Sequence, residues 1–320
     1  MGKDTVRLYV VSDIHASEKA WRKMLNAARS GMYKADAVLY AGDLTGKAMV
    51  PVVKTGDGFA AEIAGRRRIV RSEDELERLE QDIANLGYYA FRTTEDEMES
   101  LRSDPGGLAE RFRTEIQGRV RAWMRLAAER MEGSGVPIFL IPGNDDPYEI
   151  DEALAESEYC ANVDGRVVDI PGGLQVIGSG KSNRTPWSTP REVADDDFRE
   201  ELTKLTDEAR DPQRTIFLIH CPPYDSGLDR APLLDANLRP KASAGDLLRG
   251  PVGSTGVRQA IEEYAPLLGL HGHIHESGGE ARIGATLTVN PGSEAAFGVL
   301  RGYLIDVGPD GVERAFRVEG

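Results

Sequence analysis

Seven side chains that can bind a metal ion stand just after short apolar segments of this chain. They share this position behind five segments that end near residues 11, 41, 141, 219 and 270, and they are Asp13, His15, Asp43, Asn144, His220, His273 and His275. All 5 histidines of the chain lie at such segment ends. Because the carboxyl ends of strands in α/β sheets line the ligand crevice, we expect these groups to converge.

The donor types and their spacing indicate a pair of metal ions. Asp13 and His15, and likewise His273 and His275, are two residues apart, so each pair shares one face of an extended segment. Imidazole, carboxylate and amide donors suit first-row divalent ions, which leaves manganese, iron, zinc and cobalt open. One tetrahedral site needs fewer donors than these, whereas two ions about 3.5 to 4 Å apart that share a carboxylate would use them all. We therefore expect a dinuclear centre.

The elements that must position these donors read as strands of a layered α/β protein. The expected buried strands share short apolar runs separated by helical patterns, and they cover residues 6–11, 37–40, 136–141, 174–177, 215–219, 267–270 and 286–289, with two last runs at 302–307 and 312–318. Ser17 is placed to cap a helix whose Trp21, Leu25 and Ala28 face the sheet.

Residues 46–135 interrupt the alternation of apolar runs and helical patterns, because they carry many charges of both signs and few apolar runs typical of strands. We expect a single domain over residues 1–320, with 46–135 as a mainly helical insertion between the second and third strands that carry motifs. Ser72 and Glu75 form a capping-box pattern. One apolar stripe predicts a long helix that Gly133 ends, and its members are Leu108, Phe112, Ile116, Val120, Trp123 and Ala127. The arginines at 66–68 and 71 are interpreted as a solvated, ion-paired surface.

Taken in order, the motif residues resemble the calcineurin-like metallophosphoesterase superfamily. Its pattern D-x-H, G-D, G-N-H-[DE], H and G-H-x-H is met in sequence over residues 6–45, 136–148 and 214–307, and the turn at 290–293 is similar as well. The resemblance implies a four-layer αββα sandwich of two mixed β-sheets flanked by helices. It implies that Asp13, His15 and His275 bind one ion and that Asn144, His220 and His273 bind the other. Asp43 would bridge the two ions.

The same resemblance implies hydrolysis of a phosphate ester by a hydroxide that bridges the metals, since metal binding lowers the pKa of water from 15.7 toward about 7. A phosphodiester is preferred over a monoester, because bacterial members without the G-N-H histidine tend to be phosphodiesterases. The alternative is a catalytically weak or inactive scaffold that binds protein partners, which a single departure from the pattern favours. That departure is Asp145, which stands where the family has a histidine.

Because of this departure, two residues remain candidates for the general acid. One is Asp145, whose pKa would have to be raised before it could donate a proton, and the other is His271, which shares a face with His273. A substrate whose leaving group needs little protonation is a further alternative. Asp146 is either an exposed turn residue or a carboxylate that orients a ligand. Cys221 is interpreted as structural rather than nucleophilic, since no nucleophile elbow surrounds it.

The amino-acid composition of the chain limits the kinds of partner that it could bind. A formal net charge of -14 disfavours nucleic acid and anionic membranes, so we expect a small-molecule phosphate ester as substrate. The only cysteines are Cys160 and Cys221, too few for a disulfide framework, which favours a reducing, cytoplasmic location. We expect no membrane span, because no segment approaches the roughly 20 apolar residues that a span needs.

Overall fold

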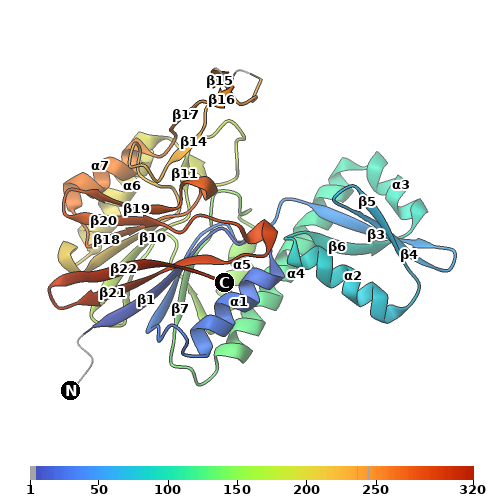
Figure 1. The fold of residues 1–320 in the computed structure, drawn as a ribbon, viewed down its shortest axis with the longest axis horizontal. Coiled ribbons are helices and arrows are strands. Elements are labelled where there is room, and N and C mark those ends of the chain that lie inside the picture. The colour runs from blue at the N-terminus through green and yellow to red at the C-terminus, as the bar shows by residue number, and fades with distance from the viewer. Residues whose placement is uncertain (1–4, 236, 244) are drawn as a thin grey trace.

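Two six-stranded sheets form the centre of the computed structural model, which describes residues 5–235, 237–243 and 245–320 (Figure 1). The first sheet has the order β22-β21-β1-β2-β7-β8. Its strands are β1 (Val6–Val11), β2 (Ala37–Ala41), β7 (Ile138–Ile141), β8 (Cys160–Asn162), β21 (Arg301–Gly308) and β22 (Gly311–Glu319). The second sheet has the order β19-β20-β18-β13-β10-β9. Its strands are β9 (Val167–Ile170), β10 (Leu174–Ser179), β13 (Thr215–Ile219), β18 (Leu268–Leu270), β19 (Gly279–Ile283) and β20 (Thr286–Asn290).

Both sheets are mixed, and their central strands run parallel. In the first sheet β1, β2, β7 and β8 are parallel while β21 and β22 pair antiparallel. In the second sheet β10, β13, β18 and β20 are parallel while β9 and β19 are antiparallel edges. The carboxyl ends of the parallel strands therefore collect at one edge of each sheet, which is where ligands bind in such folds.

Burial on both faces explains why the central strands read as continuous apolar runs. In β1, Leu8 and Val10 pack into the core between the two sheets, whereas Tyr9 and Val11 pack under the helices outside the first sheet. The second sheet repeats this arrangement, because Ile216 of β13 faces the other sheet while its neighbour belongs to the outer helical core. The four layers predicted from the resemblance are present.

Three helices cover the outer face of the first sheet: α1 (Glu18–Arg29), α4 (Pro105–Met131) and α5 (Ile150–Ala155). Ser17 caps α1 as expected, since its side chain accepts a hydrogen bond from the Ala20 N–H. Trp21 of α1 and Trp123 of α4 stack with ring centroids 4.7 Å apart and planes 3° apart. Two helices, α6 (Asp195–Glu208) and α7 (Thr255–Tyr264), cover the second sheet.

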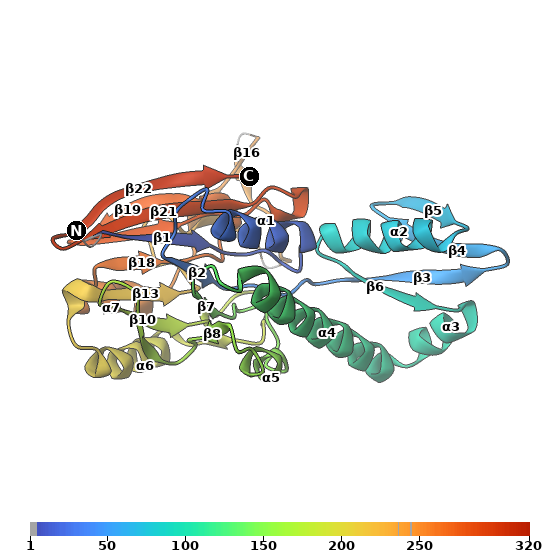
Figure 2. The ribbon, with the colours of Figure 1, turned by 90° about the horizontal axis from the view of Figure 1, so that it is seen from below.

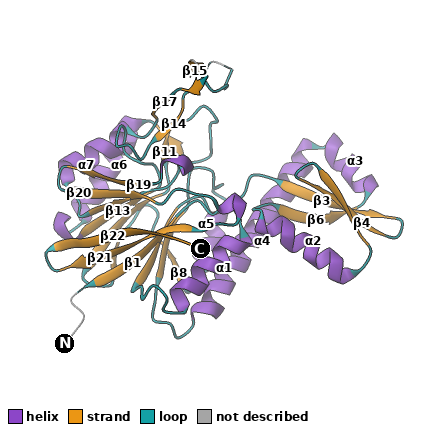
Figure 3. Ribbon diagram, viewed as in Figure 1, coloured by secondary structure: helices purple, strands orange, loops and turns teal. Residues whose placement is uncertain are grey.

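The insertion holds a sheet of its own that the sequence pattern did not predict (Figure 3). Its strands, in the order β5-β4-β3-β6, are β3 (Met49–Thr55), β4 (Gly58–Ile63), β5 (Arg66–Val70) and β6 (Tyr89–Thr93). Its helices α2 (Glu73–Asn85) and α3 (Glu95–Ser103) and the first half of α4 supply the expected helical content. The Ser72 and Glu75 capping box is present. Arg68 pairs with Asp82 and Arg71 with Asp57 at exposed positions, in line with the expected ion-paired surface.

Helix α4 belongs to both parts of the molecule (Figure 2). Ile116, Val120 and Trp123 lie in the core under the first sheet, whereas Leu108, which the predicted stripe included, is exposed. The remaining elements are short: β11 (Ser182–Asn183), β12 (Glu192–Val193), β14 (Arg230–Pro232), β15 (Ala242–Ser243), β16 (Asp246–Leu247), β17 (Arg249–Pro251) and the 3-10 turns η1 (Pro212–Arg214), η2 (His275–Ser277) and η3 (Ala295–Phe297).

Candidate metal centre

The structure brings the seven predicted ligands together in two adjoining sets. Asp13, His15, Asp43 and His275 form one set, and Asp43, His220 and His273 form the other, with the candidate ligand atoms of each set within 4.8 Å of one another. Asp43 is common to both sets. Asn144 joins the second set, because its Oδ1 lies 2.9 Å from His220 Nε2. A cluster of Asp and His side chains that could bind metal ions thus lies where the strand ends meet.

In the first set the imidazoles point at carboxylates and at each other. His275 Nε2 lies 3.5 Å from Asp13 Oδ1, and His15 Nε2 lies 3.6 Å from Asp43 Oδ2. The two Nε2 atoms of His15 and His275 are 2.9 Å apart. Asp13 Oδ2 is buried and has no hydrogen-bond partner in the described part of the chain. Such an orphaned buried oxygen is costly unless it binds a cation or a proton donor.

The second set has its donors fixed by neighbouring groups. His220 Nδ1 lies 2.8 Å from the Ala41 carbonyl, to which it donates, so a neutral His220 presents the lone pair of Nε2. That Nε2 faces Asp43 Oδ2 at 3.4 Å and Asn144 Oδ1 at 2.9 Å, and both atoms are hydrogen-bond acceptors. Acceptors that converge in this way repel one another unless a cation or a proton lies among them. The donor set therefore fits a metal ion.

The charges of the buried groups in this cluster depend on one another. Burial opposes a charge on His220, but the Asp43 carboxylate outweighs it and raises the pKa of His220 to about 10. Burial, followed by repulsion from His220, lowers the pKa of His273 to about 4, so His273 is neutral at pH 7. Burial alone would raise the pKa of Asp43, yet the surrounding histidines hold it well below its usual range. The position common to both sets is thus an ionised carboxylate, which can bind cations.

The ligand loops are held in backbone conformations that residues other than glycine rarely adopt. Asp13 (φ 52°), His15 (φ 47°), Asp43 (φ 56°) and His273 (φ 69°) are all left-handed. Each such residue costs about 1 to 3 kcal/mol, which the surrounding packing must offset, and such strain clusters at functional sites. Gly143 lets the loops approach, because a Cβ there would collide with Oδ1 and the backbone N of Asp43. The close packing fixes where the Asp43 carboxylate points.

Asp146 is fully buried, so the interpretation as an exposed turn residue is wrong. Its carboxylate accepts four hydrogen bonds, from the N–H groups of Leu44, Thr45 and Gly143 and from the Thr45 hydroxyl. It therefore ties the loop after Asp43 to the loop before Asn144. These bonds favour the second of the two interpretations, a carboxylate that orients a ligand.

The two candidates for the general acid lie in different surroundings. His271 is fully buried, its Nδ1 lies 2.8 Å from the Ile219 carbonyl, and burial lowers its pKa to about 4. Asp145 lies beside the cluster, and its backbone N–H donates to Asp43 Oδ1 at 3.1 Å. Burial, and then the Asp43 charge, raise the pKa of Asp145, while an ion pair with Lys47 opposes that rise. The placement favours Asp145 over His271 for contact with a ligand.

Several residues that support the site were not found from the sequence. The Asn144 amide donates to Thr189 Oγ1 at 2.8 Å, which turns its Oδ1 toward His220. Arg191 is buried and donates to the Asp146 carbonyl at 2.8 Å. No local pattern marks Thr189 or Arg191, because both act on partners about 45 residues away along the chain. Asn290, within the turn noted in the sequence, donates to the carbonyls of residues 272 and 274.

Cys221 has the character expected of a structural thiol. It is fully buried, its Sγ donates to Asn183 Oδ1 at 3.0 Å, and burial raises its pKa to about 12. A thiol with so high a pKa is protonated at pH 7 and is a poor nucleophile. Its neighbour His220 belongs instead to the cluster of Asp and His side chains that could hold a metal ion.

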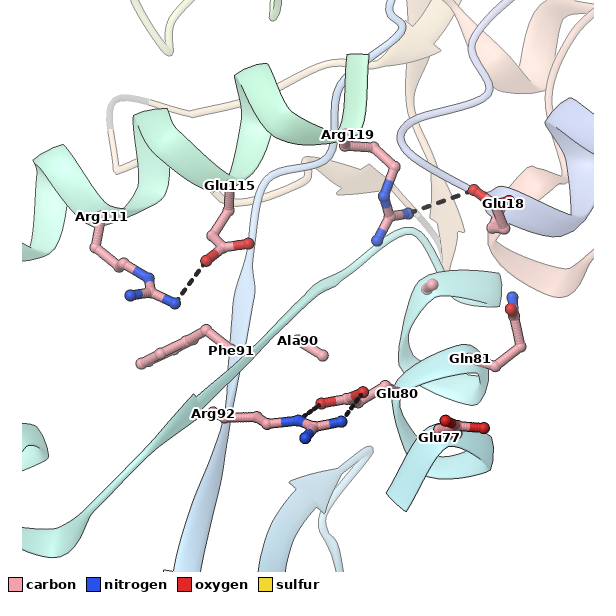
Figure 4. Close-up of a pocket in the computed structure, with 11 residues that line it drawn as sticks. Glu18, Glu77, Glu80, Gln81, Ala90, Phe91, Arg92, Arg111, Glu115 and Arg119 are labelled. Carbon is pink, nitrogen blue, oxygen red and sulfur yellow. Dashed lines mark hydrogen bonds and ion pairs between the residues drawn. The ribbon is translucent and has the colours of Figure 1, made fainter. Parts of the chain in front are cut away.

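A separate cavity of about 610 Å³ lies within the insertion, between α2, β6 and α4 (Figure 4). Its arginines are each engaged by a carboxylate: Arg92 by Glu80, Arg111 by Glu115, and Arg119 by Glu18. Glu77 adds a further negative charge to the lining. The paired charges therefore leave this cavity with no excess of positive charge.

The structure thus defines a mixed α/β sandwich with a cluster of Asp and His side chains suited to metal ions. No family model matches the chain. It is 30% identical to the uncharacterised protein MJ1162 of Methanocaldococcus jannaschii over 163 residues, which are 50% of this chain and 66% of that relative. Within the described residues, the helices offer no stretch with the length and apolarity of a membrane span.

Solved structures share the fold. One crystal structure superposes with a TM-score of 0.59 at 17% identity, over 98% of this chain and 99% of the other. TT1561 of Thermus thermophilus superposes with a TM-score of 0.53 at 16% identity, over 93% of each chain. At these identities the similarity establishes the fold alone.

Proposed function

We propose that this chain is a phosphoesterase of the calcineurin-like metallophosphoesterase superfamily that uses two divalent metal ions. The observation that carries the proposal is the pair of ligand sets joined through Asp43. The family motifs occur in the family order, and the side chains gathered in these sets follow the carboxyl ends of strands from both six-stranded sheets. Manganese, iron, zinc and cobalt all suit these donors.

In this proposal Asp13, His15 and His275 would hold one ion, and Asn144, His220 and His273 would hold the other. Asp43 is common to both sets and would serve both ions. When bound, such ions supply Lewis-acid stabilisation of the phosphate oxygens and an acidified water for in-line attack on phosphorus.

The chain's own contribution is to orient the donors before a ligand arrives. The Ala41 carbonyl, 2.8 Å from His220 Nδ1, and the Thr45 carbonyl, 3.2 Å from His15 Nδ1, fix the tautomers that present Nε2. Asp146 fixes the loop that carries Asp43. Preorganised charges of this kind favour the transition state because they need no rearrangement as the reaction proceeds.

The proposed substrate is a small phosphate ester, with a phosphodiester preferred. The formal charge of -14 argues against a long nucleic-acid partner. The buried, free thiols of Cys160 and Cys221 are compatible with the cytoplasmic location expected from the sequence.

The test combines metal analysis with a substrate panel. The purified protein, saturated with manganese or zinc and then freed of excess metal, is expected to retain two ions per chain and to hydrolyse diesters faster than monoesters. Asp43→Asn is expected to retain fewer ions and to lose at least a hundredfold in kcat/KM.

Asp207→Asn, an exposed position outside the cluster, is the matched control and should behave as the wild type. Two ions per chain without hydrolysis of any ester would favour the alternative scaffold function. Trace metal alone would end the proposal.

A further inference from the structure

Lys47 places a positive charge beside the candidate metal centre. Its Nζ forms an ion pair with Asp145 Oδ2, although the Lys47 side chain is 66% exposed and that of Asp145 only 13%. Lys47 lies between the Asp43 loop and β3, at the start of the insertion. The ammonium therefore stands at the solvent side of the pair, where an incoming ligand meets it.

The backbone that carries Lys47 is fixed from two sides. The N–H groups of Leu44 and Thr45 donate to Asp146, at 3.0 and 2.8 Å. The Gly46 N–H donates to Tyr89 Oη at 2.9 Å, which anchors the segment to β6 of the insertion. A flexible lysine on a fixed backbone can reach a ligand while its Cα stays in place.

Asp145 is joined just as directly to the ligand sets. Its N–H donates to Asp43 Oδ1 at 3.1 Å, and the preceding residue is the proposed ligand Asn144. The Asp145 carboxylate thus adds a negative charge next to Asp43 that is not part of either ligand set. A phosphate held by this cluster would lie near the Asp145 carboxylate and near the Lys47 ammonium together.

We infer that Asp145 is a specificity determinant that disfavours dianionic phosphomonoesters relative to monoanionic phosphodiesters, and that its ion-pair partner Lys47 binds the phosphate group of either ester. This inference rests on the proposed phosphoesterase function. Lys47 would bind a non-bridging phosphate oxygen, while the carboxylate of Asp145 would repel the additional charge that a monoester carries. One additional unit charge a few ångströms from a partly exposed carboxylate corresponds to a discrimination on the order of tenfold.

Two substitutions test the pair. Asp145→Asn removes the carboxylate and is expected to raise the ratio of monoester to diester kcat/KM about tenfold. Lys47→Met removes the ammonium and is expected to raise KM about tenfold for diesters and more for monoesters, with a smaller change in kcat. Lys54→Met removes an exposed lysine elsewhere in the insertion and is the control. It should leave the ratio of monoester to diester kcat/KM and the KM values unchanged.

Binding of inorganic phosphate gives a second readout that does not depend on turnover. Titration calorimetry on the metal-loaded proteins is expected to show about tenfold tighter phosphate binding by Asp145→Asn and about tenfold weaker binding by Lys47→Met. Elemental analysis should find the wild-type metal content in both variants, since neither side chain belongs to a ligand set.

The outcomes separate this inference from the proposed function. Wild-type ester ratios and phosphate affinities in both variants, at unchanged metal content, would overturn the inference and leave the phosphoesterase proposal standing. A wild-type protein that retains no metal or hydrolyses no ester would overturn the proposed function itself. Lys47 is exposed, so Lys47→Met tests the phosphate-binding part of the inference even where Asp145→Asn folds poorly, and an unchanged phosphate affinity in that variant would overturn it.

Discussion

Replacing Thr189 by valine is expected to weaken one metal site and spare the other. Thr189 Oγ1 accepts a hydrogen bond from the Asn144 amide at 2.8 Å and donates to Glu192 Oε1 at 2.8 Å. Valine has nearly the same shape as threonine but cannot accept the amide hydrogen. The Asn144 side chain would then lose the contact that holds its Oδ1 toward His220.

The expected magnitude follows from the bond that is lost. A neutral hydrogen bond contributes about 0.5 to 1.5 kcal/mol, and residues that orient metal ligands typically change affinity about 10- to 100-fold. We therefore expect a loss of about tenfold in affinity at the site formed by Asn144, His220 and His273. The site formed by Asp13, His15 and His275 should keep its affinity, because Thr189 contacts none of those residues among the bonds described.

The assay is competition with a chromogenic chelator, fitted with two binding constants. Thr185→Val is the matched control, because Thr185 Oγ1 donates to the same Glu192 Oε1 without a bond to Asn144. Equal affinities for Thr189→Val, Thr185→Val and the wild type would refute the reasoning. An equal loss at both sites in Thr189→Val would refute it as well, since the effect would then be a general loosening of the fold.

Two further predictions concern stability. Asp146→Asn sets an amide NH₂ against backbone N–H groups that now donate to the carboxylate. We therefore expect the free energy of unfolding in urea to fall by about 2 to 3 kcal/mol relative to the control Asp207→Asn. An unchanged urea midpoint would count against the role given to Asp146. The Arg7 guanidinium lowers the pKa of Asp306 below its ordinary value of 3.8, with burial opposing and Arg314 assisting. The stabilisation from Asp306 is therefore fully present above about pH 4 and is lost as the pH falls through the lower pKa of the folded state. In acid unfolding curves, the wild type should lose its stability advantage over Asp306→Asn below pH 4. A constant difference between the two proteins from pH 6 to pH 2 would contradict this.

The positions of the proposed ligands could be predicted because each follows a buried strand by a few residues. Parallel pairing of β1 with β2 carries Asp13 and Asp43 to one edge of the first sheet, and parallel pairing of β13 with β18 carries His220 and His273 to one edge of the second. Thr189 and Arg191 could not be predicted in this way, since their partners are reached only through the folded loop between β11 and β12.

The sequence of the insertion strands explains why their sheet was not predicted. Pro51 lies within β3, a central strand, where the lack of an N–H usually argues against a strand. In β5 only Val70 is buried, so Arg66, Arg67 and Arg68 conceal any apolar alternation. Both strands are stabilised by tertiary packing against Leu76, Leu79 and other members of a small separate core, which local pattern does not reveal.

Helix α4 runs without a break from the insertion into the layer that covers the first sheet, over 27 residues or about 40 Å. A shortened chain that lacks all of residues 46–135 would lose Ile116, Val120 and Trp123, which pack against the first sheet. The apolar face of that sheet would then be exposed. A soluble minimal version must keep the second half of α4 and graft it onto the end of the Asp43 loop. Protein engineers who trim this chain should therefore cut within the helix, between its exposed residue Leu108 and its first buried residue, Ile116.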